Sequence, residues 1–245
     1  MKIGMVSRTD KKEAMDLVEK IIELLDTHEL YVEKSMKKYF DLHVIKDVDF
    51  IVVIGGDGTI LRTVKEHKDT PILPVNMGTH GYLTEIKPED YKKIPEILKK
   101  HKIEERMKLN VIKDGKKVGE VLNELTMRAK RPTKVANFLL EYGNKKVSVR
   151  GDGIIVATPT GSTAYSLSAG GPVVHIKTEA IVITPLASLN RENLPTVIPN
   201  YFEVRIKNLG KDSYLVLDGV NFGVLGRDEE VSIKKSENRA KFVRI

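Results

Sequence analysis

Apolar and polar positions follow regular periods in the first part of the chain. Residues 2–7 form a short apolar run. After Asp10, apolar side chains recur at steps of three and four residues, which is the spacing of one face of a helix. The helix-face residues are Ala14, Leu17, Val18, Ile21, Leu24 and Leu25. The pattern predicts a strand over residues 2–7 and then a helix that Asp10 caps.

The run FIVVI at residues 50–54 is uninterrupted and rich in β-branched residues. Such a run predicts a parallel strand that is covered on both faces. A glycine loop, a helix from about Thr59, a strand at 72–76, a second glycine loop and a Lys-rich helix begun by Pro88 are expected to follow. This alternation of strand and helix is typical of a doubly wound parallel α/β domain.

The second half of the chain has a mostly β pattern. Segments 111–121 and 139–149 each predict two strands around an Asp-Gly or Gly-Asn turn, and hairpin-like spacing continues through 201–219. We therefore predict a β-rich, sandwich-like second domain.

The change of pattern places a domain boundary near residue 102. Residues 1–102 would form the α/β domain, and residues 103–245 the β-rich domain, with room for the extreme C-terminus to pack back on the first domain. A cleft between two such domains is the expected ligand site.

Composition narrows the class of protein. Of 245 residues, 41% are hydrophobic and 31% are charged, which is ordinary for a globular chain. No signal-peptide core and no run of about 18 apolar residues is present, so we predict a cytoplasmic protein without a membrane partner. The absence of cysteine excludes disulfides, thiolate catalysis and cysteine-bound zinc. The six histidines lack metal-ligand spacing, so no metal site built by a protein cluster is expected.

The net charge of +7 fits either a nucleic-acid surface or small anionic substrates. The basic residues are spread over separate segments, and the sequence contains no recognition-helix, finger or RNP-type pattern. We therefore expect small-molecule nucleotides as partners and no nucleic acid.

The sequence GGDGT at residues 55–59 follows the apolar run directly. A short loop between a buried strand and a helix presents backbone N–H groups to a phosphate, so Gly55, Gly56 and Thr59 form a candidate phosphate loop. Asp57 is explained if it accepts a proton from an attacking hydroxyl during phosphoryl transfer, or if it holds a divalent ion. Asp-Gly is commonly only a turn pair. The complete GGDGT sequence after an apolar strand is much rarer, which favours function.

Other nucleotide-binding loops are excluded by their missing motifs. The chain contains no G-x-x-x-x-G-K-[ST] sequence and no G-x-G-x-x-G after a strand. Neither a P-loop NTPase nor an ordinary Rossmann dehydrogenase is therefore supported.

The segment VATPTGSTAYSLSAGGP, residues 156–172, is dense in hydroxyl groups and glycine. Its hydroxyls and loop amides can bind ribose, amide and phosphate oxygens, and Tyr165 can stack on a ring. The alternative is a Ser/Thr-capped helix start in a surface loop. The density of small polar groups favours ligand binding.

Two further features are less specific. In a strand, Asn123 and Glu124 would point to opposite faces, so only one would reach a ligand unless the strand ends there. A solvated strand end explains this pair equally well. Tyr82 is a candidate aromatic wall of the pocket, with core packing as its rival.

GGDGT, the Asn-Glu pair and TPTGSTAYSLSAGGP, in this order and with these separations, resemble the NAD kinase family. That family transfers a phosphoryl group from ATP to the ribose 2′-hydroxyl of NAD. GGDGT alone is shared with diacylglycerol and sphingosine kinases, whereas the second block is specific to NAD kinases. The similarity spans about residues 50–220. It implies ATP and NAD as substrates, Mg²⁺ or another divalent cation held mainly by the nucleotide phosphates, and a homodimer or homotetramer.

The resemblance also implies roles for single residues. Asp57 would accept the proton of the 2′-hydroxyl, Gly58 would lie beside the dinucleotide, and Arg62 would lie near phosphate. Asn123 and Glu124 would touch the adenosine part of NAD. The other implied NAD-binding residues are Asp152, which reaches the nicotinamide end from a neighbouring subunit, and Lys134, Arg150, Thr160, Thr163, Ala164, Tyr165, Ser166, Leu167, Ser168 and Ala187.

The chain departs from the family pattern in two segments. Residues 76–83 read NMGTHGYL, in which His80 and Tyr82 replace the Leu and Phe of N-x-G-x-L-G-F-L. Residues 184–195 lack the central Pro-His and the Arg of T-P-x-x-P-H-S-L-S-x-R-P. Because such surroundings shape the choice of donor, polyphosphate stays beside ATP as a candidate.

The sequence thus predicts an NAD kinase that forms NADP. One alternative is a lipid kinase with the same GGDGT loop, but the second half supplies hydroxyls and glycines where an acyl channel needs Leu and Phe. The other is a non-catalytic dinucleotide-binding module, against which the intact Asp57 argues.

Overall fold

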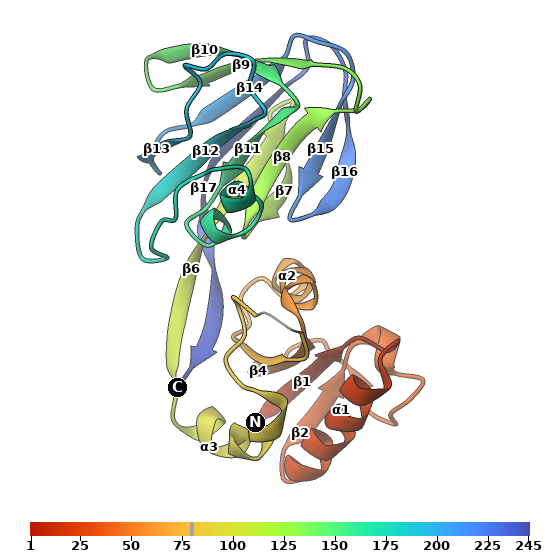
Figure 1. The fold of residues 1–245 in the computed structure, drawn as a ribbon. Helices are drawn as coiled ribbons and strands as arrows, with labels where there is room; N and C mark the ends of the chain where they lie inside the picture. The colour runs from red at the N-terminus through yellow and green to blue at the C-terminus, as the bar shows by residue number, and fades with distance from the viewer. Residues whose placement is uncertain (79–80) are drawn as a thin grey trace. The chain divides into compact units, whose positions relative to one another are not determined.

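The chain forms two compact units in the computed structural model, which describes residues 1–78 and 81–245. Unit 1 comprises Met1–Glu105 together with Ala240–Ile245, and unit 2 comprises Arg106–Arg239 (Figure 1).

Unit 1 is built on a parallel sheet with the strand order β5-β4-β1-β2-β3. Its strands are β1 (Lys2–Ser7), β2 (Glu29–Val32), β3 (His43–Val44), β4 (Phe50–Gly55) and β5 (Ile72–Asn76), and all neighbouring pairs are parallel. Its helices are α1 (Lys12–Leu24), α2 (Asp57–Glu66) and α3 (Ile94–Lys99), with 3-10 helices η1 (Lys34–Met36) and η2 (Pro88–Lys93).

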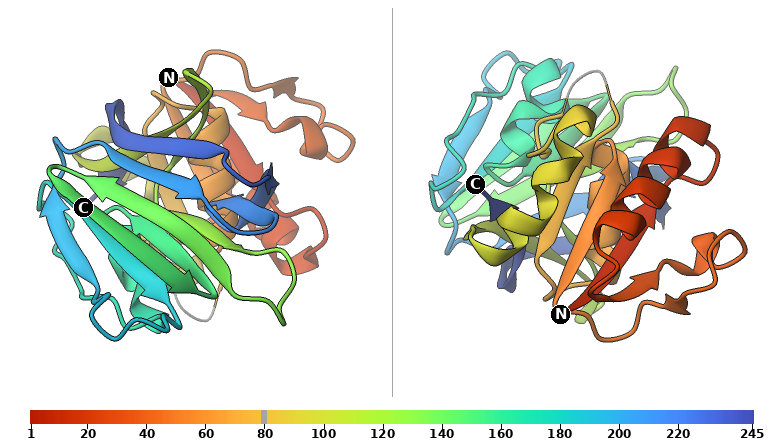
Figure 2. Two further views of the ribbon diagram at one scale, coloured as in Figure 1. Left: turned by 90° about the horizontal axis from the view of Figure 1, so that it is seen from above. Right: turned by 90° about the horizontal axis from the view of Figure 1, so that it is seen from below.

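Helices cover both faces of this sheet, as the buried run in β4 predicts. Residues 51–54 have no exposed surface. Helices α1 and α3 share one apolar core with β1, β4 and β5 (Figure 2, right), while α2 packs on β4 and β1 from the other side (Figure 1). The predicted doubly wound α/β architecture is therefore confirmed.

Three predicted helix starts are wrong in detail. Helix α1 begins at Lys12, and the Asp10 carboxylate binds the Arg8 guanidinium through hydrogen bonds of 3.0 and 2.6 Å in place of capping the helix. Helix α2 begins at Asp57 and not near Thr59, so the acid lies in its first turn. Pro88 begins a 3-10 helix, and α3 follows from Ile94.

Unit 2 is a sandwich of two sheets (Figure 2, left). One sheet has the order β10-β9-β14-β17, with β6 paired to β17 and β7 paired to β6, and the other has the order β13-β12-β11-β8-β15-β16. The strands are β6 (Lys102–Lys113), β7 (Lys116–Val121), β8 (Glu124–Ala129), β9 (Ala136–Tyr142), β10 (Lys145–Gly151), β11 (Gly153–Ala157), β12 (Ala180–Leu186), β13 (Thr196–Pro199), β14 (Val204–Asn208), β15 (Ser213–Leu217), β16 (Val220–Leu225) and β17 (Glu230–Arg244).

Both sheets contribute inward-facing side chains to one core. Met127 of β8 and Val156 of β11 belong to the same buried cluster as Phe138 of β9 and Ile206 of β14. The 3-10 helix η3 (Gly161–Thr163) and helix α4 (Tyr165–Ser168) lie in the connection between β11 and β12. The predicted β-rich sandwich is confirmed.

Two of the three predicted hairpins form. The turn between β6 and β7 has φ values of 52° at Asp114 and 73° at Gly115, as a type I′ turn requires. Gly143, with φ 56°, turns β9 into β10. The predicted pairing within 201–219 is wrong, because β14 and β15 belong to different sheets. The buried Asn208 amide donates to the Lys211 carbonyl at 2.9 Å in the connection between them.

No helix within the described residues is long and apolar enough to cross a membrane.

Candidate functional site

Asp57 lies in the first turn of α2, directly after the buried strand β4. Its two carboxylate oxygens accept hydrogen bonds from consecutive backbone N–H groups, Tyr82 N–H at 3.4 Å and Leu83 N–H at 3.3 Å. A helix leaves the N–H groups of its first turn without intrahelical acceptors, and its dipole favours negative charge there. The two N–H groups therefore orient the acid at a position that also attracts anions.

The glycines around Asp57 differ in what they do. A Cβ at Gly55 would lie 2.6 Å from Thr59 Oγ1 and 2.8 Å from Thr59 Cβ, so close packing requires glycine there. At Gly56 and Gly58, by contrast, an added Cβ would meet no described atom within 4 Å. Gly56 has an ordinary φ of −97°, and Gly58 is helical, so backbone conformation does not demand glycine at either position. These two glycines leave open space.

That space belongs to a cavity of about 300 Å³ lined by Arg8, Gly56, Gly58, Thr59 and Arg62. Two arginines and the start of a helix make it suitable for a phosphate group. Arg8 was not among the predicted site residues, because nothing in its local sequence links it to the GGDGT loop.

Arg62 has a carboxylate partner that the sequence did not reveal. Its guanidinium binds both oxygens of Glu33, through Nη1 and through Nη2 at 3.2 Å, and Glu66 lies 3.7 Å away. The hydrogen bonds that Arg62 donates to Glu33 raise the pKa of Arg62 above its ordinary value. Ser35 Oγ donates to Glu33 at 2.7 Å. Arg62 is thus fixed beside the cavity by a buried acid from the end of β2.

In unit 2, the Asp218 carboxylate collects three backbone N–H groups at the start of β8. Its oxygens accept from Leu122 at 2.8 Å, from Asn123 at 2.8 Å and from Glu124 at 3.1 Å. Asp218 has a φ of 47° in the β15–β16 turn, which brings its side chain to this strand end. β8 begins at Glu124, so Asn123 lies just outside the strand. The two side chains are therefore not forced onto opposite faces of the sheet, and both can serve one site.

Glu124 is an unusual carboxyl group. It is only 7% exposed, and its Oε2 atom has no hydrogen-bond partner among the described residues. Burial, with a smaller contribution from the nearby Asp218 charge, raises the pKa of Glu124 to about 7. Both its protonated form and its ionised form are therefore accessible near neutral pH.

The hydroxyl-rich loop after β11 packs directly on this strand end. Asn123 O accepts from Thr158 N–H at 2.9 Å, and a Cβ at Gly161 would lie 2.1 Å from the same oxygen. Thr158 Oγ1 donates to Leu122 O at 2.5 Å and accepts from Gly161 N–H at 3.1 Å. The predicted Asn-Glu pair and the predicted hydroxyl-rich segment, residues 156–172, are thus brought together.

Several hydroxyls of this loop are used by the loop itself. Ser162 Oγ donates to Pro159 O at 2.7 Å, and the buried Ser166 shares a 2.8 Å hydrogen bond with Thr184. The hydroxyl groups of these two residues are therefore already paired within the protein. Tyr165 and Leu167 are 42% and 41% exposed, so these side chains remain accessible.

A second group of predicted residues lies at the opposite end of β11. Asp152 precedes the strand, its N–H donates to Leu186 O at 2.9 Å, and Arg150 O accepts from Leu189 N–H at 2.8 Å. Ala187 is held at a φ of 42°, which non-glycine residues rarely adopt. Along the strand, Asp152 and Thr158 are about 20 Å apart at about 3.3 Å per residue.

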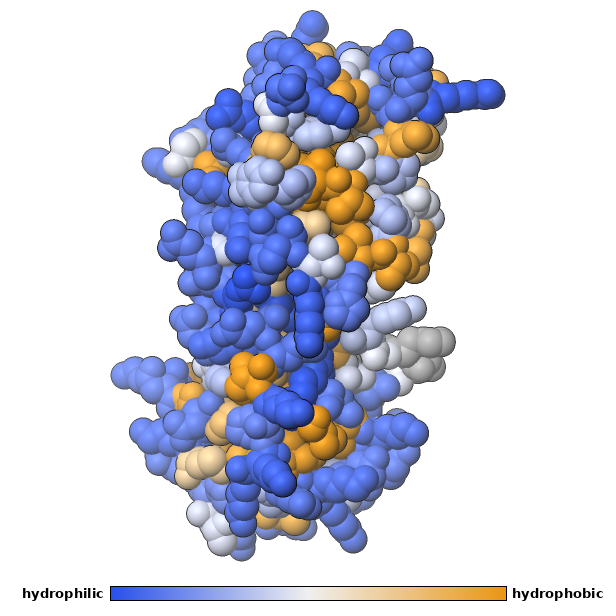
Figure 3. Space-filling view, turned by 90° about the vertical axis from the view of Figure 1, so that its left-hand side faces the viewer, coloured by the Kyte–Doolittle hydropathy of each residue, from blue (hydrophilic) through white to orange (hydrophobic). Residues whose placement is uncertain are grey.

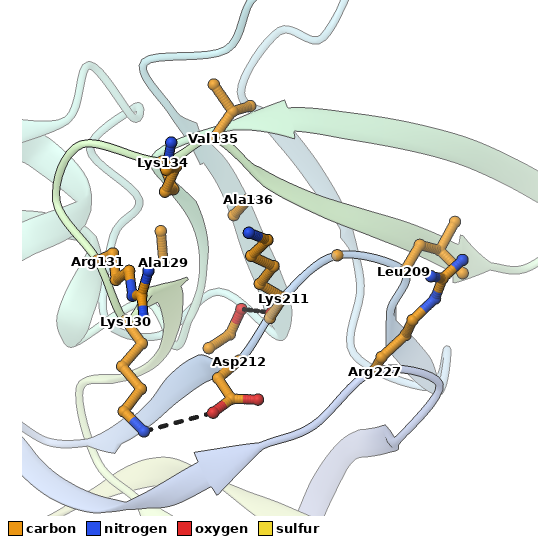
Figure 4. A pocket seen from close by; sticks show the side chains of 12 residues that line it. Ala129, Lys130, Arg131, Lys134, Val135, Ala136, Leu209, Lys211, Asp212 and Arg227 are labelled. Atoms are coloured by element: carbon orange, nitrogen blue, oxygen red, sulfur yellow. Dashed lines mark hydrogen bonds and ion pairs between the residues drawn. The ribbon is translucent and has the colours of Figure 1, made fainter.

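Lys134 lies in a basic cavity of about 650 Å³ in unit 2 (Figure 4). The connection between β8 and β9 supplies the cations on one side, and loops before β15 and after β16 supply the others (Figure 4). The charged lining residues are Lys130, Arg131, Lys134, Lys211, Asp212 and Arg227. Lys130 pairs with Asp212 at 3.3 Å, so cations remain in excess. Sequence reasoning found only Lys134 of this group, because the others come from segments without a motif.

Family profiles match both halves of the chain. The profile of the ATP-NAD kinase N-terminal domain matches residues 27–103, and that of the ATP-NAD kinase C-terminal domain matches residues 122–245. The chain belongs to the NAD kinase family.

Curated relatives and solved structures agree with this family. The NAD kinases of Pyrococcus abyssi and Methanosphaera stadtmanae are 39% and 38% identical to the chain, and each match covers 100% of this chain and 94% of the relative. A crystal structure of an NAD kinase from Archaeoglobus fulgidus in complex with ATP is similar at a TM-score of 0.82 and 30% identity, covering 99% of this chain and 93% of that one. Yeast NADH kinase complexed with NADH has a TM-score of 0.91 at 22% identity, covering 100% and 83%, which shows a shared fold.

The remaining predicted residues are placed as follows. The Tyr82 side chain is 66% exposed, so the rival prediction of core packing is wrong. His80, which departs from the family pattern, lies outside the described residues. In the described part of the chain, no group of three or more His, Cys, Asp or Glu side chains could hold a metal ion.

Proposed function

We propose that the chain is an NAD kinase, which transfers the γ-phosphoryl group of ATP to the 2′-hydroxyl of the adenosine ribose of NAD and releases NADP and ADP. Membership of the NAD kinase family supports this reaction. The observation that carries it is the placement of Asp57 in the first turn of α2, beside a cavity that Arg8 and Arg62 line.

The reaction needs positioned charge more than covalent chemistry. The N-terminus of α2 and the two arginines would hold the phosphates. As the bond from the 2′-oxygen to the γ-phosphorus forms, the bond from the γ-phosphorus to the bridging oxygen of ADP breaks. The hydroxyl proton passes to Asp57.

The geometry of Asp57 leaves room for that proton. A carboxylate has about four lone-pair sites, and the Asp57 oxygens accept one N–H group each. The remaining lone pairs can face a hydroxyl while the two N–H groups keep the carboxylate oriented. This arrangement supports a role for Asp57 as the general base.

A divalent cation, normally Mg²⁺, is part of this proposal. It would neutralise charge on the transferred phosphoryl group and be held mainly by the nucleotide phosphates. The open space over Gly56 and Gly58 allows a phosphate with its bound cation to approach the helix.

Unit 2 would recognise NAD. We assign the adenosine part to Asn123 and Glu124, and ring stacking to Tyr165, because the first two share a strand end with the polar loop and the Tyr165 side chain is exposed. Thr160, Thr163, Ala164 and Ser166 to Ser168 complete the proposed loop contacts. Lys134 and the basic cavity around it would attract the anionic nucleotide.

We further propose a homodimer or homotetramer in which Arg150, Asp152 and Ala187 contact the nicotinamide end of NAD bound to a neighbouring subunit. Their position at the far end of β11 supports a role separate from that of the polar loop. Leu189, which is bonded to Arg150, is 61% exposed, and Figure 3 shows apolar side chains gathered on one face of the upper part of the molecule. Apolar surface of this kind is typical of an interface.

The central experiment compares the wild-type protein with Asp57→Asn. Purified protein, ATP, Mg²⁺ and NAD should yield NADP, measured with an NADP-specific dehydrogenase. Loss of a general base should lower kcat by about 10² to 10⁴-fold, while the Kd for NAD, measured by calorimetry, stays near wild type. Asp41→Asn is the matched control, since Asp41 is fully exposed and pairs with Lys37 at 3.6 Å. Near-normal turnover of Asp57→Asn would refute the assigned role.

The alternatives are separated in the same assay. A lipid kinase would phosphorylate diacylglycerol and leave NAD unchanged. A non-catalytic module would bind NAD without forming NADP. Replacing ATP by polyphosphate tests the donor, and cell fractionation tests the proposed cytoplasmic location.

The shared site has a complementation test. Asp57→Asn and Asp152→Asn subunits should each be inactive alone if Asp152 acts in a neighbouring site. In a dimer, random mixing of equal amounts would restore roughly a quarter of the wild-type sites, because half of the dimers then hold one intact site. No recovery after verified subunit exchange would place Asp152 in its own subunit's site or outside the site.

A further inference from the structure

Near the end of the chain, Arg244 is bonded to the segment that holds Asp57. Its Nη1 atom donates to Leu83 O at 3.3 Å, and the N–H group of the same Leu83 donates to Asp57 Oδ1 at 3.3 Å. A single residue therefore links the guanidinium of Arg244 to the carboxylate of Asp57. All three residues belong to unit 1.

Arg244 is held by more than this one bond. Its Nη1 atom also donates to Glu85 at 3.0 Å, and its Nε atom donates to Glu104 at 3.0 Å. The guanidinium lies 5.2 Å from the centre of the buried Phe242 ring, and its side chain is 15% exposed. Charge-assisted bonds of limited exposure are stronger than surface pairs. The position of Arg244 is therefore well determined.

The segment from Tyr82 to Ile86 pairs with β5 at its C-terminal end, through Glu85 and Ile86. Glu85 N–H donates to Pro74 O at 3.0 Å, and Ile86 forms a parallel bridge with Val75. β17 joins the same strand β5 at its start, where Phe242 pairs with Ile72. The end of β17 and the end of the Tyr82–Ile86 segment therefore both pair with β5.

Strand pairing alone does not fix Tyr82 and Leu83. Among the described residues, the backbone hydrogen bonds from this segment to β5 begin at Glu85, two residues after Leu83. Those N–H groups lie at 3.4 and 3.3 Å from the carboxylate, near the limit of a hydrogen bond, so a small shift would lose them. The hydrogen bond from Arg244 to Leu83 O holds the segment between its pairing with β5 and its contacts with Asp57.

We propose that Arg244 is a positioning residue for the phosphoryl transfer. It fastens the Tyr82–Glu85 segment so that two successive N–H groups orient the Asp57 carboxylate toward the reacting hydroxyl. This inference rests on the proposed function of Asp57. Arg244 acts through the segment and contacts no reacting atom.

The test compares Arg244→Gln, Arg244→Lys and the wild-type protein. Misplacement of a catalytic group by about 1 Å can lower the reaction rate about 10²-fold. Arg244→Gln should therefore lower kcat by about 10- to 100-fold, while KM for ATP and for NAD changes less than about twofold. Arg244→Lys keeps a charged donor and should recover part of kcat. Arg205→Gln is the matched control, because it removes an exposed Arg–carboxylate pair, Arg205–Glu203, in unit 2.

Hydrogen exchange supplies a second measurement that does not need activity. In Arg244→Gln, the amides of Tyr82 and Leu83 should exchange faster, while those of β1 and β4 keep wild-type rates. The proposal is overturned if both kcat and exchange at these two amides match the wild type. It is also overturned if exchange rises equally across unit 1, which would show general destabilisation. A wild-type protein without NAD kinase activity would refute the proposed function, and the exchange result would still decide whether Arg244 holds the segment.

Discussion

Replacing Glu124 by Gln should change how the stability of the protein depends on pH. Burial and the Asp218 charge raise the pKa of Glu124 from 4.5 to about 7. At 1.36 kcal/mol per pKa unit, this displacement corresponds to about 3 kcal/mol of differential stability. Glu124 is 7% exposed, so little of this is screened by solvent.

The sign follows from the two states. Below about pH 4.5, Glu124 is protonated in both the folded and the unfolded protein, and burial of the neutral acid carries no ionisation cost. Between pH 4.5 and 7, the unfolded chain loses this proton while the folded protein keeps it, so the free energy of unfolding falls as pH rises. Above pH 7, the folded protein bears the full cost of the buried charge.

The assay is urea unfolding of the wild-type protein and Glu124→Gln, without nucleotide, at intervals between pH 5 and 8.5. Glutamine has no proton to lose, and unit 1 is the same in both proteins, so their difference isolates the titration of Glu124. Relative to the variant, the wild-type protein should lose about 2 to 3 kcal/mol over this range. A difference that stays constant with pH would refute the reasoning.

Glu120 provides a comparison with the opposite sign. Burial raises its pKa, but hydrogen bonds from Lys117 and Ser236 and the charges of Lys108 and Lys117 outweigh burial and lower the pKa to about 2. The stability that ionised Glu120 contributes is therefore present above pH 4.5 and is lost as pH falls toward 2. Glu120→Gln should remove stability at neutral pH and flatten the acid limb of the curve, with no effect on the slope between pH 5 and 8.

Three further substitutions test the geometry of the two loops. Glu33→Gln should raise KM for ATP several-fold by releasing Arg62, with Glu66→Gln as a control that leaves the two-oxygen pairing intact; equal KM values in the two variants would contradict this. Gly58→Ala should stabilise α2 by about 0.5 to 1 kcal/mol in thermal unfolding, and it should weaken ATP binding because the methyl group enters open space; unchanged ATP binding would show that no ligand uses that space. Gly161→Ala should destabilise the protein by about 1 to 3 kcal/mol, since its Cβ would lie 2.1 Å from a backbone carbonyl oxygen; an unchanged melting temperature would show that the loop can move aside.

Elements that depend on burial alone were well predicted from the sequence. The run in β4 is apolar at every position because both faces of the strand are covered, and residues 51–54 have no exposed surface. In α1, the predicted face contains the buried residues Ala14, Leu17, Val18 and Ile21. The turn at Asp114 and Gly115 was found because positive φ values select those residue types.

What depends on distant partners was not predicted. The alternation of apolar and polar residues predicts strands β14 and β15, but it contains no information on which sheet each strand joins. The two strands lie in different sheets. Glu33 and Arg62 are 29 residues apart, and Asp218 meets Asn123 across 95 residues. Glu33 and Asp218, the partners of these site residues, lie in parts of the sequence that show no motif.

The presence of an acid among the glycines of the first loop has a physical explanation in this arrangement. A loop that only bound phosphate would gain nothing from Asp57, whose charge repels the ligand. Here the start of α2 stabilises that charge, while Arg8 and Arg62 line the adjoining cavity and can offset it for an incoming phosphate. Gly56 and Gly58 keep that space open, so repulsion by one fixed carboxylate is the cost of placing a proton acceptor next to the transferred group. Loss of either arginine should therefore weaken the binding of ATP more than loss of Asp57 strengthens it.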